Sequence, residues 1–357
     1  MTNAVPWEVG GEYHWSGLPS GPFLPWPGPR AWFPLGHETV LALWRELSAT
    51  GRELVLWVPD FFCPEVTGSW TESGVTLRLY ADDPRWPSPD WETLAPEPDD
   101  LVLAVNHFGV RDPDAWREWQ RSHRSVVLIE DHSHDPLSSW ARASRADYAF
   151  ASLRKTSPVP DGAFLWSPRG RALPPEPGRR EWTGSALKLS AMIWKAEYIG
   201  GAGGRASKET FRSFQLAGER SLFETRGAAI SPWSRALLEP GYPLEWRGRR
   251  ESNVRAFFDR WYGDGTALPL FTEWPEGHCP FNPILVFDSM ARRETFRTAL
   301  IESGVYAPVH WAPLPGASER ATDLAGRILT LPLDQRYGLD DVSRVISVLD
   351  EIGGSRT

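Results

Sequence analysis

The stretch SVVLIEDHSHDPLSSWARASRADYAFASLRKT, residues 125–156, decides the fold class. Val126–Ile129 is apolar on both faces, which is typical of a strand covered by helices on both sides, and it runs directly into acids and histidines. A second β-rich run, Ala146–Ala151, leads into Ser152 and Lys155. Ligands of α/β sheets bind beyond the carboxyl ends of the strands. The stretch therefore predicts two strands of such a sheet, each followed by residues that can carry chemistry.

The first half of the chain alternates between β-rich and helical segments. Three further β-rich runs are Glu53–Val58, Val75–Tyr80 and Leu101–Asn106. The segment His37–Ser48 follows Gly36 and has apolar residues at the i, i+3, i+4, i+7 spacing of a helix. This alternation predicts an α/β fold with a mostly parallel sheet flanked by helices.

The second half has a different character. Helical patterns at 249–261, 291–303 and 340–352 mix with short strand patterns at 284–287, 305–309 and 328–331. This mixture predicts a smaller α+β domain. We expect three parts in order along the chain: an N-terminal arm at residues 1–35, a large domain at 36–238 and a small domain at 239–357.

Composition excludes several classes of function. The 357-residue chain has a formal charge of −8, with 24% charged and 41% hydrophobic residues, which is typical of a folded globular protein. No basic block could neutralise a nucleic-acid backbone, so we expect no nucleic-acid partner. Apolar runs such as Leu54–Val58 are far shorter than the roughly 20 residues that span a membrane, so no membrane partner is expected. The N-terminal residues lack a secretory-signal pattern, which predicts a cytoplasmic protein.

The residues after Val126–Ile129 allow two functional interpretations. Asp131 at a strand end can stay ionised beside a buried cation, although a simple turn aspartate is the alternative. His132 and His134 would project to the same side of an extended chain, and with Asp131 and Asp135 they raise the alternative of a metal site. No second cluster of suitable spacing completes such a site, and the two cysteines, one of them Cys63, provide no zinc motif. We therefore expect no metal.

Two more motifs can carry chemistry. Lysine occurs only at positions 155, 188, 195 and 208, and Lys155 follows a strand close to Ser152, where a desolvated amine can act as a nucleophile; an ordinary surface lysine is the alternative. The Ser-x-x-Lys spacing also matches penicillin-recognising enzymes, but their partner motifs are missing here. Gly36-His37-Glu38 opens a predicted helix, where free amides and the helix dipole favour an anion.

Together the motifs resemble a known family. An anion site, an acid after one strand and Ser with Lys after the next occur in this order in the fold type I pyridoxal-phosphate (PLP) enzymes. The chain is most similar to the DegT/DnrJ, sugar aminotransferase-like, aminotransferases. The segments that carry the resemblance are GHETVL (36–41), VPDFFC (58–63), VNHFG (105–109), IEDHSH (129–134), DYAFASLRK (147–155), DG (161–162) and LPLDQRY (331–337). The resemblance implies an aspartate-aminotransferase-like α/β fold with a smaller α+β C-terminal domain.

The resemblance also implies roles for individual residues. Lys155 would form the Schiff base with PLP and move the substrate proton, and Asp131 would pair with the pyridinium nitrogen. His134 would lie near the phenolic oxygen of the cofactor, and Phe62 would stack on its ring. The phosphate would be held by Ser152 together with the backbone amides of Gly36, His37 and Glu38. Fold type I active sites generally lie at a dimer interface, so a homodimer is expected.

Two features depart from the family pattern. Ser152 and Lys155 are three positions apart, whereas family members have a longer spacing. The Gly-Tyr-Asn segment, through which a partner subunit usually reaches the phosphate, has no counterpart after Lys155; Gly200–Arg205 occupies roughly that region. For the substrate, Arg336 could bind a carboxylate in a bidentate manner and His310 follows a predicted strand, with surface or packing roles as the alternatives.

The resulting hypothesis is a PLP-dependent aminotransferase that moves an amino group between an amino acid donor and a keto or aldehyde acceptor. Three alternatives stay open. The first is a PLP enzyme that performs dehydration, decarboxylation or cyclisation, because fold does not separate these reactions. The second is a non-catalytic relative that keeps the fold, and the third is a metal hydrolase centred on His132 and His134.

Overall fold

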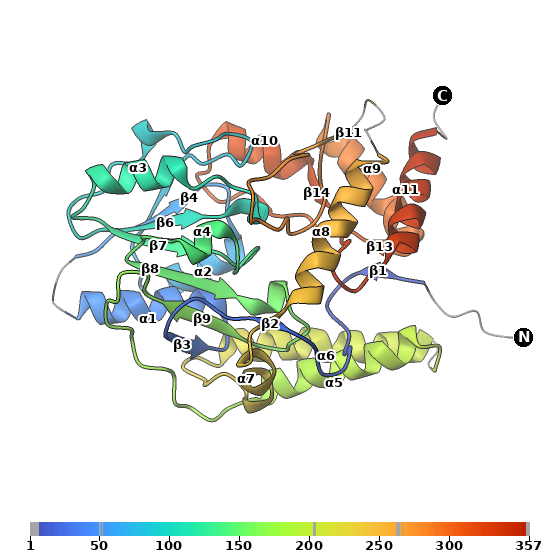
Figure 1. The fold of residues 1–357 in the computed structure, drawn as a ribbon, viewed down its shortest axis with the longest axis horizontal. Coiled ribbons are helices and arrows are strands. Elements are labelled where there is room, and N and C mark those ends of the chain that lie inside the picture. Colours follow the sequence, from blue (N-terminus) through green and yellow to red (C-terminus); the bar gives the residue numbers. More distant parts are fainter. Residues whose placement is uncertain are drawn as a thin grey trace, which may run out of the picture.

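A seven-stranded sheet forms the centre of the computed structural model, which describes residues 7–49, 51, 53–202, 205–261, 265 and 267–354 (Figure 1). The strand order is β3-β9-β8-β7-β6-β4-β5. The bounds are β3 Arg30–Phe33, β4 Leu56–Pro59, β5 Leu77–Tyr80, β6 Leu101–Val105, β7 Val127–Asp131, β8 Tyr148–Ser152 and β9 Ala163–Trp166. Strands β4 to β8 pair in parallel, whereas β9 is antiparallel to both β8 and β3. The predicted mostly parallel sheet is confirmed.

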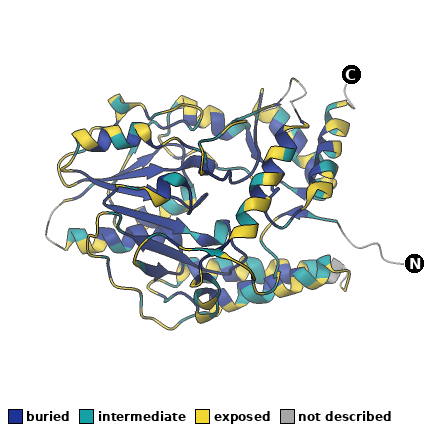
Figure 2. Ribbon diagram, in the orientation of Figure 1, coloured by how far each residue is buried: buried dark blue, intermediate teal, exposed yellow. Residues whose placement is uncertain are grey.

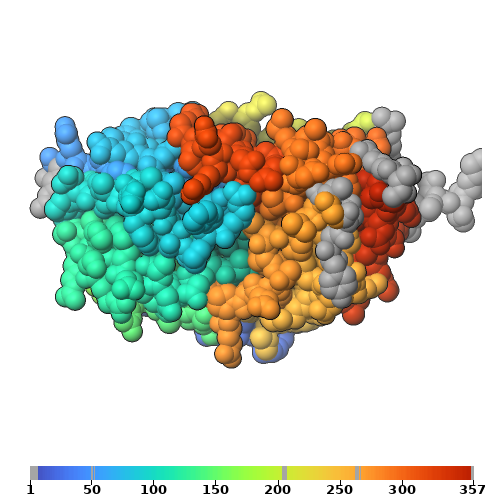
Figure 3. Space-filling model, turned by 90° about the horizontal axis from the view of Figure 1, so that it is seen from above, coloured from blue at the N-terminus to red at the C-terminus, as the bar shows by residue number. Residues whose placement is uncertain are grey.

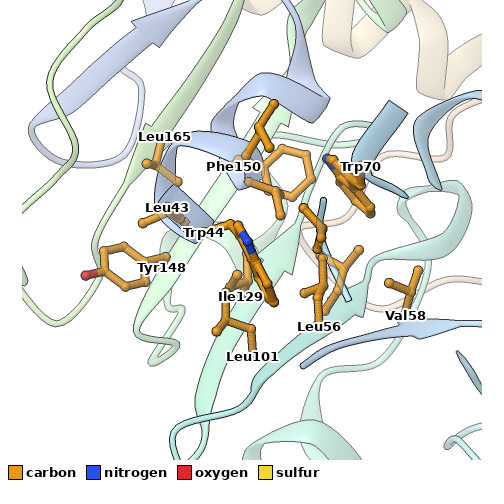
Figure 4. Packing of buried hydrophobic residues seen from close by; sticks show 14 of the residues in the cluster. Leu43, Trp44, Leu56, Val58, Trp70, Leu101, Ile129, Tyr148, Phe150 and Leu165 are labelled. Carbon is orange, nitrogen blue, oxygen red and sulfur yellow. The ribbon is translucent and has the colours of Figure 1, made fainter. Parts of the chain in front are cut away.

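Both faces of the sheet are covered, as the apolar central strands require. All five residues of β6 are buried. Leu101 packs in a cluster with Leu43 and Trp44 of helix α1 (Gly36–Ser48) and with Trp70 of α2 (Pro64–Glu72), which Figure 4 shows. On the opposite face, the intervening β6 residues pack against tryptophans of α3 (Asp114–Ser122) and α4 (Ser139–Arg142). The sheet is therefore the buried middle layer of three, as its dark colour in Figure 2 shows.

A long helical hairpin follows the sheet in the sequence. Helices α5 (Thr183–Ile199) and α6 (Arg205–Glu224) run side by side along one edge of the molecule, and the short α7 (Pro232–Leu238) follows them (Figure 1). The glycine-rich residues 200–204 lie between these two long helices in the sequence. Of these, residues 203 and 204 lie outside the described part of the chain.

The C-terminal part mixes helices and strands, as the sequence predicts. Its helices are α8 (Leu244–Phe258), α9 (Met290–Glu302), α10 (Glu319–Arg327) and α11 (Leu339–Gly354). Strands β11 (Ala267–Pro269), β12 (Ile284–Phe287) and β14 (Ile328–Thr330) form an antiparallel sheet. Phe257, Phe296 and Val345 join its separate core. Figure 3 shows this part, coloured orange to red, beside the blue-to-green first half.

The N-terminal segment is more structured than its sequence suggests. Strand β3 is an edge strand of the central sheet, although no strand periodicity is visible at its position. Strands β1 (Val9–Gly10) and β2 (Phe23–Leu24) pair with β13 (Val305–Tyr306) and β10 (Tyr242–Pro243), which belong to the second half of the chain. The segment thus connects the two halves. Within the described residues, no helix is long and apolar enough to cross a membrane.

Candidate active site

A cavity of about 670 Å³ lies beyond the carboxyl ends of β6, β7 and β8. Asn106, Asp131 and Ser152, each at or just after one of these strand ends, line it. The first turn of α1 and the C-terminal part of α6 complete its walls. This volume is typical of small-molecule and cofactor sites. The position is the one expected for a ligand site in a sheet of this type.

The start of α1 forms one end of the cavity. No side chain caps this helix at Leu35, so the backbone N–H groups of Gly36 and His37 are not bonded to a capping side chain. Gly36 packs closely on the end of strand β8, because a Cβ atom added to Gly36 would lie 2.9 Å from Cβ of Ser152. Unused amides at a helix start bind anions, and a glycine lets the anion approach closely. This end of the cavity fits a phosphate.

Replacing Gly36 by alanine tests this close approach. The added methyl group must displace Ser152, and overpacking of this kind costs about 1–3 kcal/mol. For the phosphate of PLP, the anion that the sequence resemblance implies, we expect Gly36→Ala to lower the affinity at least tenfold, measured by equilibrium titration. Gly68→Ala is the matched control, because Gly68 lies in α2 with no atom near the added Cβ. Equal PLP affinity in both variants would contradict the assignment.

Asp131 lies at the end of β7 and is 8% exposed. Its Oδ1 accepts a hydrogen bond from the backbone N–H of Ser133 at 2.8 Å. No other hydrogen bond to this carboxylate is found in the described part of the chain. The aspartate is thus fixed in orientation and has a free oxygen, rather than serving only as a turn residue.

His134 presents a buried hydrogen-bond donor. Its Nδ1 accepts the backbone N–H of Phe108 at 3.0 Å, which places the proton of the neutral ring on Nε2. Nε2 is buried and has no partner among the described residues. Burial, followed by the charge of Lys155, lowers the pKa of the ring well below its usual value. The imidazole is therefore a neutral donor that a ligand in the cavity can satisfy.

His132 lies elsewhere, which corrects the prediction that both histidines face the same side. Its Nε2 lies 3.0 Å from Oε2 of Glu130, and its ring packs edge-on against Trp140. The chain leaves the extended conformation after β7, so the two-residue alternation of a strand does not continue to His134. Asp135 instead pairs with Arg247. The described residues contain no group of three or more potential metal ligands, so nothing here supports the metal alternative.

Ser152 and Lys155 lie at the adjacent strand end. The backbone N–H of Ser152 bonds to Oγ of Ser133 at 2.9 Å, which ties the ends of β7 and β8 together. Lys155 is the last residue of the 3₁₀ turn Leu153–Lys155, and its Nζ lies 5.6 Å from the centre of the Trp311 ring. No carboxylate of the described chain lies within ion-pair distance of Nζ. The amine is therefore available to a ligand in the cavity.

Aromatic side chains form the sides of the cavity. Phe62 lines it and stacks on Trp70 with ring centres 5.8 Å apart. Phe61, its neighbour, packs instead with Phe108. Trp311 lies nearly parallel to the His134 ring, 5.8 Å away. The sequence prediction chose Phe62 and missed Trp311, for which no local pattern exists.

A chain of charges that the sequence prediction missed forms another wall. Arg154 and Lys188 both lie 2.5 Å from Oε2 of Glu219, and Lys188 also lies 2.6 Å from Glu12. Burial opposes ionisation of Glu219, but the two cations outweigh it and lower its pKa to about 2. Nearby on α6, Phe223 stacks on the His37 ring at 4.9 Å. Helix α6 and the N-terminal segment thus both contribute side chains to the wall of the cavity.

No protein-family model matches the sequence, and no curated protein sequence matches it. Solved structures, by contrast, have a similar fold. Spr1654 of Streptococcus pneumoniae in its PMP form has a TM-score of 0.64 at 16% identity, covering 92% of this chain and 88% of that one. PseC of Helicobacter pylori, an aminotransferase involved in pseudoaminic acid biosynthesis, has a TM-score of 0.62 at 12% identity, with coverages of 92% and 88%. A DegT/DnrJ/EryC1/StrS aminotransferase of Brucella abortus has a TM-score of 0.58 at 13% identity, with coverages of 92% and 87%.

The fold is PLP fold type I. The predicted aspartate-aminotransferase-like architecture is thus confirmed, and the neighbours with this fold include DegT/DnrJ-type aminotransferases.

Three predicted site residues of this type I fold lie away from the cavity. The backbone N–H of Glu38, which was predicted to hold the phosphate, bonds instead to the carbonyl of Leu35 at 3.2 Å. The side chain of Glu38 lines a separate pocket with Arg45, and burial raises its pKa to about 7. His310 lies near the site, 6.3 Å from the His134 ring, but its Nδ1 is 2.7 Å from Oγ1 of Thr330 and it does not line the cavity. Arg336 forms a two-pronged ion pair with Asp334, at 2.9 and 2.7 Å.

Arg336 also lies over the ring of Tyr13, outside the cavity. The structure therefore does not bring it to a substrate carboxylate. Gly36, His37, Phe62, Asp131, His134, Ser152 and Lys155 do meet in the cavity.

Proposed function

We propose that this chain is a PLP-dependent enzyme and that aminotransfer is its reaction. The observation that carries the proposal is the meeting of four groups in one cavity: an amine without an ion pair at Lys155, a buried carboxylate at Asp131, an uncapped helix start at Gly36 and a buried unpaired donor at His134. Each of them has a counterpart on PLP.

The residues fit this cofactor. The free oxygen of Asp131 would accept a hydrogen bond from the pyridinium N–H, and Nε2 of His134 would donate one to the phenolic oxygen. The amides at the start of α1 and the Ser152 hydroxyl would hold the phosphate, and Phe62 would lie against the ring. When bound, PLP supplies an electron sink for the negative charge that develops at the substrate carbon.

The residues of the chain would supply the remaining steps. The Lys155 amine would take a proton from the substrate carbon as a positioned general base, and the resulting ammonium would give the proton up again as a general acid. Asp131 would keep the ring nitrogen protonated by accepting a charge-assisted hydrogen bond from it. Helix α6, which lines one side of the site, would exclude water there.

Arg154 is an additional phosphate ligand in this proposal. It lines the cavity beside the helix start, and after burial its charge is the largest cause that lowers the pKa of His37, to about 4. Glu219 holds it in place at 2.5 Å. We expect Arg154→Gln to weaken PLP binding by about 10–100-fold, the range of a lost charge-assisted hydrogen bond of about 1.5–3 kcal/mol.

Pyridoxal, which lacks the phosphate, provides the comparison ligand for this prediction. Its affinity should change less than twofold in Arg154→Gln, and Arg226→Gln, which removes a nearby exposed cation, should leave both affinities unchanged. If Arg154→Gln weakens pyridoxal and PLP equally, Arg154 does not bind the phosphate.

The substrate is proposed to be a small amino compound with a keto or aldehyde acceptor. A single-turnover experiment tests the reaction: PLP-loaded protein is mixed with one amino donor at a time, and cofactor and donor products are quantified. Aminotransfer converts the cofactor to its amino form with one equivalent of keto acid. Loss of carbon dioxide or water from the donor would favour a PLP enzyme that does not transaminate. Absence of reaction with every donor would favour a non-catalytic protein.

Three further predictions are part of the proposal. They are a homodimer in solution, a cytoplasmic location, and the division into an arm, a large domain and a small domain at residues 35 and 238. Light scattering at several protein concentrations measures the first of them.

A further inference from the structure

The backbone just after Lys155 is held by an unusual concentration of donors. The carbonyl oxygen of Thr156 accepts hydrogen bonds from Nε2 of Gln335 at 2.8 Å, from the hydroxyl of Tyr242 at 3.0 Å and from Nη2 of Arg250 at 3.1 Å. A carbonyl oxygen has two lone pairs, so three donors saturate it. Thr156 is fully buried. The peptide group between Thr156 and Ser157 is therefore held in place by side chains that lie outside the turn.

The donors are also bonded to one another. Nη2 of Arg250 donates to Oε1 of Gln335 at 2.6 Å, and Nε2 of Gln335 donates to the Tyr13 hydroxyl at 3.2 Å. The Tyr13 hydroxyl in turn donates to the carbonyl of Lys155 at 3.4 Å. These residues come from the N-terminal segment, from α8 and from the segment after β14, so three distant parts of the chain converge on one turn.

The burial of Arg250 in this network lowers the stability of the fold. It is 2% exposed, and in the described structure no carboxylate lies within ion-pair distance of it. Its Nε is buried without a hydrogen-bond partner. A buried cation without a paired anion is destabilising, and features that break the rules of stable packing are expected at functional sites. A contribution to stability alone does not account for this residue.

The turn that carries Lys155 is short. It is a single 3₁₀ turn, after which the N–H groups of Thr156 and Ser157 bond back to the carbonyl of Leu153 at 3.1 and 2.8 Å. Short 3₁₀ segments have poor hydrogen-bond geometry, and a misplacement of 1 Å can cost about 100-fold in rate. The direction of the Lys155 side chain depends on this backbone.

We propose that Tyr13, Arg250 and Gln335 are positioning residues for Lys155: through the carbonyls of Lys155 and Thr156 they hold its amine where it can attack the aldehyde carbon of PLP. The inference rests on the proposed function. In that attack the amine nitrogen bonds to the aldehyde carbon and the aldehyde oxygen leaves as water. The network would set the rate of this step without contacting the cofactor.

Two variants remove parts of the network, and a third variant serves as a control. Gln335→Leu keeps the side-chain size and deletes the bonds to Thr156, Tyr13 and Arg250. Tyr13→Phe deletes one hydroxyl. Tyr306→Phe is the matched control, because its hydroxyl bonds to Lys208, away from Lys155. Each protein is mixed with PLP, quenched with borohydride at set times, and analysed by mass spectrometry for label on Lys155.

The expected result is a rate of labelling at least tenfold lower in Gln335→Leu, about threefold lower in Tyr13→Phe and unchanged in Tyr306→Phe. In a Lys155→Ala background, Gln335→Leu should change PLP affinity less than twofold, because the cavity itself is intact. Equal labelling rates in wild type and Gln335→Leu would overturn the proposal. So would a fall in PLP affinity as large as the fall in rate, because that indicates general distortion.

Two further outcomes are separable. If Gln335→Leu does not fold, Tyr13→Phe and Arg250→Lys carry the same comparison, and normal labelling in both would overturn the inference. If wild-type protein is not labelled at Lys155 at all, the proposed function fails first and the positioning inference fails with it.

Discussion

Lys155→Ala protein saturated with PLP will show free-cofactor absorbance and turnover at least 1,000-fold below wild type. In the proposed function the variant lacks both the nucleophile for the cofactor and the base for the substrate proton, and a positioned base alone contributes about 10²–10⁴-fold. Wild type will show a shifted absorption band that borohydride bleaches. Absorption spectra and single-turnover rates measure the two effects.

Lys208→Arg is the control for this experiment. Lys208 pairs with Glu8 and lies outside the cavity, so its variant should keep the wild-type spectrum and rate. Wild-type turnover in Lys155→Ala would remove Lys155 from the mechanism and leave the other cavity residues without a catalytic amine.

Asp131→Asn will retain the fold and lose most of the activity. The amide oxygen can still accept the Ser133 N–H, so the melting temperature should stay within about 2 °C of wild type. The negative charge that would hold the proton on the cofactor nitrogen is lost, and removing one partner of a buried charge pair costs about 2–5 kcal/mol. We expect the single-turnover rate to fall by about 10²–10³-fold.

The matched control is Asp112→Asn, an exposed aspartate after β6. It should leave the rate unchanged. A rate in Asp131→Asn within threefold of wild type would mean that this carboxylate has no electronic role.

The sequence predicted the centre of the sheet well because its strands are buried on both faces. Leu101–Val105 and Val126–Ile129 are continuous apolar runs that are followed directly by polar residues, a pattern that needs no long-range information. The edge strand β3 was missed, since it has only four residues and pairs with a strand about 130 positions away. The local periodicity of the sequence does not reveal pairing between strands that are this far apart in the chain.

The site was predicted only where its residues follow strands. Trp311, Glu219 and Glu12 reach the cavity from distant segments, and no motif marks them. Arg336 is different, because Asp334 two positions earlier provides a local counter-charge that the sequence already contained. Attention to that pair would have predicted a neutralised arginine rather than a substrate anchor.

The most direct test of the central claim is peptide mapping of wild-type protein after reaction with PLP and borohydride. Four lysines exist, so the position of the label is decisive. We predict stoichiometric label on the peptide that contains Lys155 and none at the other three positions. Label on Lys188, Lys195 or Lys208 instead, or no label at all, would contradict the claim that this cavity binds PLP through Lys155.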